Sequence, residues 1–256
     1  MENMKKNIEV ELKFQVLDEA QIEELLKNLQ FINEKRMVDV YLDTGKGDLY
    51  KKGIFVRIRD NRKLEFKFNL AAFQNQNKLN WHEECSEFSF PLPLASASDS
   101  VDSINKICKI LKLKEITTPN LEEFKNKNNL IDSILIDKIR REYKDKKFRY
   151  SFDDVKKLGK FIEIEFLASE EDDIEKIKNE MREKLSNLKL KLITTGYNEV
   201  YWRKYNFNLY LQGRYLFEED YKKYRPQAGK RNIKNWFWCR GRRGELYKST
   251  FRKIRS

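Results

Sequence analysis

Charged residues recur at every second position in five separate stretches of this chain, with apolar residues between them. The charged positions are Glu9, Glu11 and Lys13; Arg57 and Arg59; Glu65 and Lys67; Lys138 and Arg140; and Glu163 and Glu165. The intervening positions are apolar, as at Val10 and Ile164. Because successive side chains of a strand point to opposite faces, each stretch predicts a strand with one charged and one apolar face.

The same reading extends along the rest of the chain. Period-two patterns predict eight antiparallel strands at 8–16, 37–44, 54–60, 63–69, 81–92, 132–144, 147–155 and 160–168. Apolar spacings of three and four predict helices at 18–31, 100–116 and 172–193. The fold class is therefore α+β, mainly antiparallel β, and this many meandering strands usually close into a barrel or a sandwich.

The alternation allows two arrangements of such a sheet. Either the apolar faces point inward and the charges face water, or the charges line the interior and helices cover the apolar faces. The second arrangement buries cations, which need an anionic ligand, together with carboxylates, which need protons or a metal ion. A polyphosphate bound to Mg²⁺ or Mn²⁺ satisfies both demands, because oxygen ligands suit these ions and Arg and Lys bind phosphate.

Several other functional classes are disfavoured by the composition. The three cysteines, Cys85, Cys108 and Cys239, form no CxxC pair, so a disulfide framework or a zinc site is not expected. The single histidine, His82, has no Ser or Cys nucleophile motif nearby, and no glycine-rich phosphate loop occurs. No apolar stretch approaches a membrane span, and the first residues show no signal-peptide core, which predicts a cytoplasmic protein without membrane contact.

Charge is concentrated at the end of the chain. Residues 201–256 hold 16 Lys and Arg against 4 Asp and Glu, which equals the whole net charge of +12, and 14 of the 33 aromatic residues. We therefore divide the chain into a body, 1–202, and a basic aromatic extension, 203–256. Basic residues interleaved with aromatics suit RNA or single-stranded DNA, although an extension that simply packs on the body is the alternative we favour.

Several segments, in order, resemble the CYTH family, also called triphosphate tunnel metalloenzymes, which includes class IV adenylyl cyclases, thiamine triphosphatases and tripolyphosphatases. The matching segments are IEVELKF, DVYLDT, LYKKGIFVRIR, KLEFKF, DKIRREY and FRYSFDDVKKLGKFIEIEF, within residues 8–166. A later segment, GYNEVYW at 196–202, is similar to the family's closing motif, with Gly196 in place of Ser. No counterpart in the family core is evident for 203–256.

The resemblance implies a fold and a set of roles. The fold would be an eight-stranded, closed antiparallel tunnel barrel with flanking helices. The metal-binding and catalytic carboxylates would be Glu9, Glu11, Asp153, Glu163 and Glu165. The triphosphate-binding residues would be Lys13, Arg57, Arg59, Lys67, Lys138 and Arg140. A further inward acid would be Glu83 or Glu84, and the sequence does not choose between them.

The expected activity is hydrolysis of a triphosphate-containing substrate, such as tripolyphosphate or a nucleoside or thiamine triphosphate, with Mg²⁺ or Mn²⁺. We favour hydrolysis because a water nucleophile needs no ordered ribose. The alternative is an adenylyl cyclase that forms cyclic AMP and pyrophosphate from ATP with the same residues. A second alternative is an RNA 5′-triphosphatase, or a non-catalytic RNA 5′-triphosphate binder, that uses the basic extension. The oligomeric state is open, and a homo-oligomer is compatible with the sequence.

Overall fold

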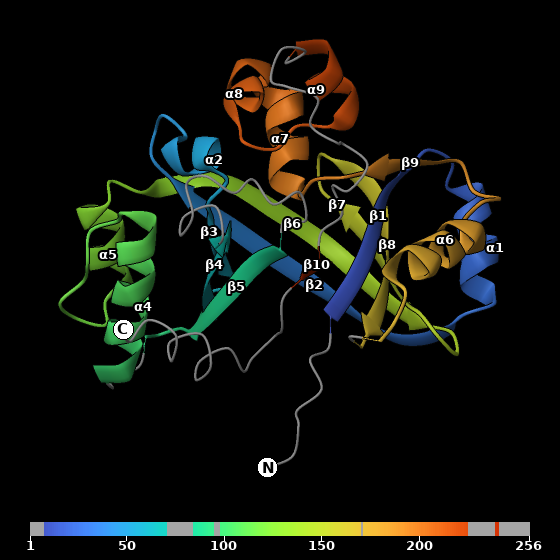
Figure 1. The fold of residues 1–256 in the computed structure, drawn as a ribbon, viewed down its shortest axis with the longest axis horizontal. Helices are drawn as coiled ribbons and strands as arrows, with labels where there is room; N and C mark the ends of the chain where they lie inside the picture. Colours follow the sequence, from blue (N-terminus) through green and yellow to red (C-terminus); the bar gives the residue numbers. More distant parts are fainter. Residues whose placement is uncertain (1–7, 71–83, 95–97, 170, 225–238, 241–256) are drawn as a thin grey trace.

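One ten-stranded, mainly antiparallel sheet forms the frame of the molecule (Figure 1). The computed structural model describes residues 8–70, 84–94, 98–169, 171–224 and 239–240. The strands are β1 (Ile8–Val16), β2 (Gln30–Asp43), β3 (Phe55–Arg59), β4 (Lys63–Asn69), β5 (Glu84–Pro91), β6 (Ile131–Lys144), β7 (Arg149–Val155), β8 (Gly159–Ala168), β9 (Leu190–Ile193) and β10 (Cys239–Arg240). They lie in the order β10-β5-β4-β3-β2-β6-β7-β8-β1-β9.

Helices flank this sheet on several sides. They are α1 (Ala20–Lys27), α2 (Asp48–Lys52), α4 (Ser98–Leu111), α5 (Leu121–Lys127), α6 (Ile174–Lys184), α7 (Tyr197–Tyr205), α8 (Phe207–Gln212) and α9 (Glu218–Tyr224). The expected α+β class, mainly antiparallel with flanking helices, is confirmed.

The eight expected strands are all present as β1 to β8, but the expected eight-stranded closed barrel is wrong. Within the described residues, the outer strands β1 and β5 do not pair with each other. Only the two-residue strand β10 lies between them, antiparallel to β1 and parallel to β5. The sheet also gains β9, which pairs with the second half of β1. Alternation predicts each strand well, but it does not specify which strand edges meet.

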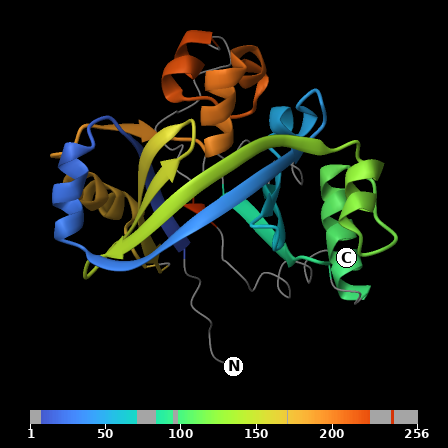
Figure 2. The ribbon, with the colours of Figure 1, turned by 180° about the vertical axis from the view of Figure 1, so that it is seen from behind.

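The charged faces of the strands point inward, and helices cover the apolar faces outside. On one side, the apolar residues of β3, β4 and β5 pack against α4 and α5, with Phe66 and Phe124 among the fully buried rings. On the other side, those of β1, β7 and β8 pack against α1 and α6. Figure 1 and Figure 2 show these two wings at opposite ends of the long pair β2 and β6. The structure therefore adopts the second arrangement described above, in which the charges line the interior and helices cover the apolar faces.

All three predicted helices are too long: α1 ends at Lys27 and β2 begins at Gln30, inside the predicted helix 18–31, and α4 ends at Leu111 rather than at 116. The largest difference is in the third helix. The segment 172–193 was expected to be a single helix, but α6 ends at Lys184 and the chain resumes as β9 at Leu190. Leu188, Leu190 and Leu192 alternate with lysines, which is a strand pattern. The free edge of β1 accepts this strand, with Lys13 opposite Ile193. The correction matters because β9 leads directly into α7.

Much of the aromatic content of residues 203–224 is core. Tyr210, Leu216 and Tyr221 form a small buried cluster with Trp202, and Tyr215 and Phe217 join the central cluster beside Phe55. A side chain at Gly213 would collide with the ring of Tyr50, so this unit packs closely on α2. For this part of the chain the packing role that we favoured is what is seen. The domain boundary at 202/203 remains a prediction, and it falls inside α7.

We predict that Ile164→Ala destabilises the fold far more than Leu167→Ala. Ile164 is 0% exposed on β8, whereas Leu167 on the same strand is 63% exposed. The first change should lower the free energy of unfolding by about 2–5 kcal/mol, because it opens a cavity. The second should change it by no more than about 0.5 kcal/mol. Urea unfolding of both variants measures this, and equal losses would contradict the inward orientation of the charged face.

Candidate active site

A cleft of about 350 Å³ lies on the charged face of the sheet. Charged side chains supply 17 of the 29 lining residues, nine basic and eight acidic. All six of the predicted triphosphate-binding residues are among them: Lys13, Arg57, Arg59, Lys67, Lys138 and Arg140. The sequence alone did not single out Lys35, Arg62 or Lys63, which also line the cleft. Six cations from β1, β3, β4 and β6 therefore converge on one space.

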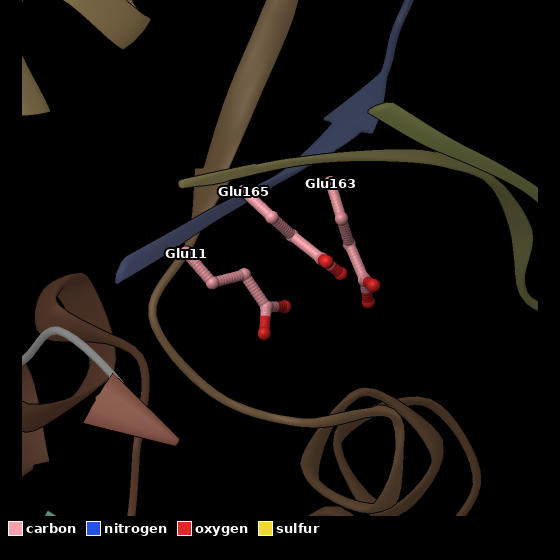
Figure 3. Close-up of side chains that lie close together, drawn as sticks. All are labelled: Glu11, Glu163 and Glu165. Atoms are coloured by element: carbon pink, nitrogen blue, oxygen red, sulfur yellow. The ribbon is translucent and has the colours of Figure 1, made fainter. Parts of the chain in front are cut away.

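Three carboxylates gather at one part of this face. Glu11 on β1 and Glu163 and Glu165 on β8 each offer an oxygen, and these oxygens lie within 4.8 Å of one another. The register explains the cluster, because Glu11 is directly opposite Glu165 and Glu163 is two residues along the same face. Figure 3 shows the three side chains pointing toward one another.

This cluster fits a hard divalent cation. Glu11 and Glu163 are buried and Glu165 is half-buried, so three negative charges share a site that water shields poorly. An all-oxygen donor set without Cys or His suits Mg²⁺ or Mn²⁺. The described residues contain this one group of three acids with such spacing.

Two cations border the carboxylate cluster. Lys13 Nζ lies 2.8 Å from a Glu163 oxygen and 3.7 Å from a Glu11 oxygen. Arg140 Nη2 lies 2.6 Å from the other Glu163 oxygen. Glu163 therefore belongs both to the acidic cluster and to the basic lining, and it couples the two.

Asp153 on β7 is the centre of a buried network beside the cleft. Its carboxylate accepts hydrogen bonds of 2.6 Å from Lys138, 2.6 Å from Arg140 and 2.7 Å from the hydroxyl of Tyr197. Burial opposes ionisation of Asp153, but Lys138 and Arg140 together hold its pKa below the ordinary value. Burial and the neighbouring Arg140 lower the pKa of Lys138 to about 8. Asp153 lies outside the three-acid cluster, and its role as a metal ligand remains a prediction.

The opposite wall of the cleft is built from β2, β3, β4 and β5. Arg57 lies 2.7 Å from Glu65, and Arg59 lies 2.8 Å from Asp39. Burial opposes ionisation of Asp39, but the charges of Arg57 and Arg59 lower its pKa to about 2. Lys67 pairs with Glu87 at 3.0 Å. Asp39 was missed by the sequence analysis, although its period-two spacing from Tyr41 placed both side chains on one face.

The first residue of α7 reaches into this network. Lys13 Nζ and Lys138 Nζ lie over the Tyr197 ring, 4.5 Å and 4.9 Å from its centroid. Burial and the charge of Asp153 raise the pKa of Tyr197 well above its ordinary value, so its hydroxyl remains a proton donor. The closing motif that contains Tyr197 was noticed in the sequence, but no role in the site was assigned to it.

Some predicted residues fall outside the described side chains. The structure gives Glu9 only as backbone, opposite Leu167 in the sheet register. The choice between Glu83 and Glu84 also lies outside the described side chains, as do His82 and most of the basic residues of 225–256 on which RNA contact was predicted. Cys108 is buried, and burial raises its pKa to about 12, in line with an inert thiol.

Within the described residues, no helix is both long enough and apolar enough to cross a membrane.

We predict that Glu165→Gln weakens Mn²⁺ binding by at least about tenfold. Substitution of residues that only hold a metal ligand in place typically lowers metal affinity by roughly 10–100-fold, and this change removes a charged oxygen of the cluster itself. Titration of Mn²⁺ followed by electron paramagnetic resonance measures the affinity. The matched control is Glu87→Gln, an acid of the same cleft outside the cluster, for which we expect little change. Equal losses in both variants would argue against a site at the cluster.

We predict that Asp153→Asn lowers stability by about 3–5 kcal/mol, because it leaves the buried Lys138 and Arg140 without their shared counter-charge. Tyr197→Phe removes a single hydrogen bond to the same carboxylate and should cost about 1 kcal/mol. Urea unfolding compares the two. A loss in Asp153→Asn no larger than that in Tyr197→Phe would show that the network is not held by the aspartate charge.

Comparison with known proteins places this geometry in a family. The CYTH domain pattern matches residues 7–196. A Methanocaldococcus jannaschii protein whose name proposes an adenylate cyclase is 26% identical over 185 residues, which are 72% of this chain and 90% of that protein. The PH1819 protein of Pyrococcus horikoshii OT3 has a similar fold, with a TM-score of 0.51, 21% identity and coverage of 77% of this chain and 99% of that one. HpAC1 from Hippeastrum, for which a dominant triphosphatase activity is described, gives a TM-score of 0.49 at 16% identity. The alignment covers 77% of this chain and 95% of that one. Because the domain pattern spans most of the chain, this protein belongs to the CYTH family, whose members are enzymes acting on triphosphate substrates.

Proposed function

We propose that this protein is a metal-dependent phosphohydrolase that cleaves a triphosphate-containing substrate in the charged cleft. The observation that carries the proposal is the convergence of six basic side chains and a three-carboxylate cluster on one face of the sheet. Members of the family act on triphosphates, and CYTH triphosphate tunnel enzymes depend on metal ions. A lone basic cleft would suit any polyanion, whereas the adjacent acidic cluster suits a polyanion that carries a divalent cation.

The internal ion pairs explain how such a ligand could enter. Glu163 is paired with Lys13 and Arg140, and Asp39 with Arg59 and Arg57. Glu11, Glu163 and Glu165 would hold a divalent ion, and Lys13 and Arg140 would then lose part of their pairing with these carboxylates. The freed Lys and Arg groups would then bind phosphate oxygens, and buried charge would stay balanced. Metal and triphosphate binding should therefore be mutually favourable.

The residues have distinct tasks in hydrolysis. When bound, Mg²⁺ or Mn²⁺ would neutralise charge on the phosphate oxygens. Arg57 and Arg59 on one wall and Lys138 and Arg140 on the other would hold the phosphate chain from both sides and fix its orientation. As water attacks the terminal phosphorus, its oxygen forms a new P–O bond and the bridging P–O bond breaks, with the electron pair leaving on the diphosphate. One proton of the water stays on the orthophosphate and the other passes to bulk water. These fixed cations would stabilise the developing charge.

The cleft wall favours hydrolysis over cyclisation. Its described aromatic side chains are already engaged: Phe55 stacks on Tyr215, Phe66 packs on Phe90 and Phe124, the Tyr41 hydroxyl meets Arg57 at 3.4 Å, and Tyr197 binds Asp153. A nucleobase would therefore find little free aromatic surface in this wall, while a phosphate chain needs none. The name of the Methanocaldococcus jannaschii relative favours the alternative, an adenylyl cyclase in which the ribose 3′-hydroxyl attacks the α-phosphorus and pyrophosphate leaves.

A product assay tests the proposal. The protein is incubated with Mg²⁺ or Mn²⁺ and separately with tripolyphosphate, ATP, thiamine triphosphate and a 5′-triphosphorylated RNA, and phosphorus NMR resolves the products. We expect orthophosphate release. Cyclic AMP with pyrophosphate would support the cyclase instead, and tight binding without turnover would support a binding module.

We predict that Glu163→Gln and Arg57→Ala each lower kcat/KM by at least about 100-fold, which is the typical loss when a charge-stabilising group is removed from an active site. The matched control is Arg36→Ala. Arg36 is an exposed arginine of β2 that pairs with Asp137 and does not line the cleft. Initial rates on the best substrate measure the effect. Full activity in Glu163→Gln would refute its assignment to the metal site.

A further inference from the structure

The segment 194–199, which joins β9 to α7 and includes the first turn of that helix, closes part of the cleft. We refer to it below as the turn. β9 runs antiparallel to β1, with Ile193 opposite Lys13, and so delivers residues 194–199 to the same space as the phosphate-binding lysines. All six residues of this turn line the cleft. Thr195 is 2% exposed and Glu199 is 0% exposed. The turn is thus an interior wall of the site rather than a surface loop.

Three polar atoms of this turn are buried without a hydrogen-bond partner among the described residues. They are the hydroxyl of Thr195, the amide oxygen of Asn198 and the Oε1 oxygen of Glu199. A buried polar group without a partner typically costs about 1–3 kcal/mol, so three in one short turn need an explanation. A polar ligand in the cleft would supply the missing partners.

Helix capping accounts for only one of the two oxygens of the Glu199 carboxylate. Its Oε2 oxygen accepts a hydrogen bond of 3.0 Å from the backbone N–H of Gly196, the residue that caps the start of α7. In a complete capping box the first residue would return a side-chain hydrogen bond, but glycine has no side chain to do so. The Oε1 oxygen takes no part in the cap, and it is the atom left without a partner.

Glu199 lies in the field of the cleft's own cations. Burial raises its pKa to about 7, against the opposing effects of backbone N–H groups and of Lys13 on β1 and Lys67 on β4. These lysines are themselves near carboxylates: Lys13 is paired with Glu163 and Glu11, and Lys67 with Glu87. Tyr197 is the remaining titratable group of the turn, and it stays protonated. When phosphate oxygens bind Lys13 and Lys67, their negative charge offsets the attraction between these lysines and an ionised Glu199 carboxylate.

We propose that the turn at residues 194–199 is a donor subsite for one phosphate oxygen, to which the Thr195 hydroxyl and the protonated carboxyl of Glu199 donate hydrogen bonds. This inference rests on the proposed function, since it assumes that the cleft binds a triphosphate. An ionised Glu199 would repel the phosphate, whereas the neutral acid offers a proton at the oxygen that lacks a partner. Binding therefore takes up a proton at Glu199, and no covalent bond is formed or broken.

Calorimetric titration of the 256-residue chain with tripolyphosphate in EDTA tests this, because hydrolysis is suppressed without metal. We compare wild type with Glu199→Gln, whose amide preserves the cap acceptor and carries a permanent donor. With a pKa of about 7, roughly nine-tenths of Glu199 is protonated at pH 6 and one-tenth at pH 8. The wild-type Kd divided by the variant Kd should therefore rise about tenfold between pH 6 and pH 8. Titration of the phosphate itself cancels in this ratio.

Two further readouts make the result decisive. In buffers of different ionisation enthalpy at pH 7, wild type should take up about half a proton more than Glu199→Gln on binding. Thr195→Val should weaken binding about tenfold at both pH values, because a hydrogen bond to a charged group is lost, while Thr195→Ser should not. Binding with a constant Kd ratio and equal proton uptake would overturn the subsite and leave the proposed function standing. If neither protein binds tripolyphosphate in EDTA, the subsite proposal fails, whereas the proposed metal-dependent function is decided by the product assay with Mg²⁺ or Mn²⁺.

Unfolding of the ligand-free proteins checks that Glu199 titrates. Its raised pKa means that the folded state holds the proton more tightly than the unfolded state between pH 4.5 and about 7. Its contribution to stability is therefore full below pH 4.5 and is lost as pH rises through 7. The melting temperature of Glu199→Gln should rise relative to wild type from pH 5 to pH 8. A difference that is constant with pH would show that the buried carboxyl does not change its charge, and would count against the subsite.

Discussion

The balance of buried charge on the inner face of the sheet determines much of the rest of the structure. Burying an unpaired charge costs several kcal/mol, so strands that turn cations inward must also turn carboxylates inward. Asp153 meets this need for Lys138 and Arg140, and Asp39 and Glu65 meet it for Arg57 and Arg59. With the charges inside, the apolar faces lie outside, and helices must cover them. The two hydrophobic clusters under α4 with α5 and α1 with α6 follow from this requirement.

The same balance allows the carboxylates to exchange their Lys and Arg partners for a metal ion. Each carboxylate that now neutralises a cation is also an oxygen donor of the kind that a divalent ion prefers. Glu163 shows this double role best, because it contacts Lys13 and Arg140 while lying in the cluster with Glu11 and Glu165. A metal-bound triphosphate brings both partners at once, so neither sign of charge is left uncompensated. The ligand-free pairing is therefore a reason to expect that metal and phosphate bind together rather than separately.

The sequence predicts the strands better than their assembly. Period-two alternation predicts a strand at each of β1 to β8, because each has one face against helices and one against charge, but it misses the first half of β2, which begins at Gln30. It does not reveal which face is interior, since that depends on how helices distant in sequence pack. It also fails for the end of 172–193, where a charged helix pattern continues into alternating leucines that the open edge of β1 captures as β9. The six basic residues could be grouped in advance because they share this alternation. Asp39 and Glu199 were missed because the first sits among apolar residues and the second resembles an ordinary helix cap.

Substrate choice has to arise outside the common charged strands. A hydrolase, a cyclase and a binding module for triphosphates would all use the same cations and carboxylates, so these residues cannot separate them. The turn before α7 differs in kind: it brings neutral or protonatable donors to the cleft, which can distinguish phosphate oxygens by their charge and protonation. Its position is fixed from behind, because Tyr215 stacks on Phe55 and the close contact of Gly213 with Tyr50 seats α8 on α2. Packing in residues 203–224 thereby holds a polar turn in the cleft, where the charged strands alone cannot distinguish one triphosphate substrate from another.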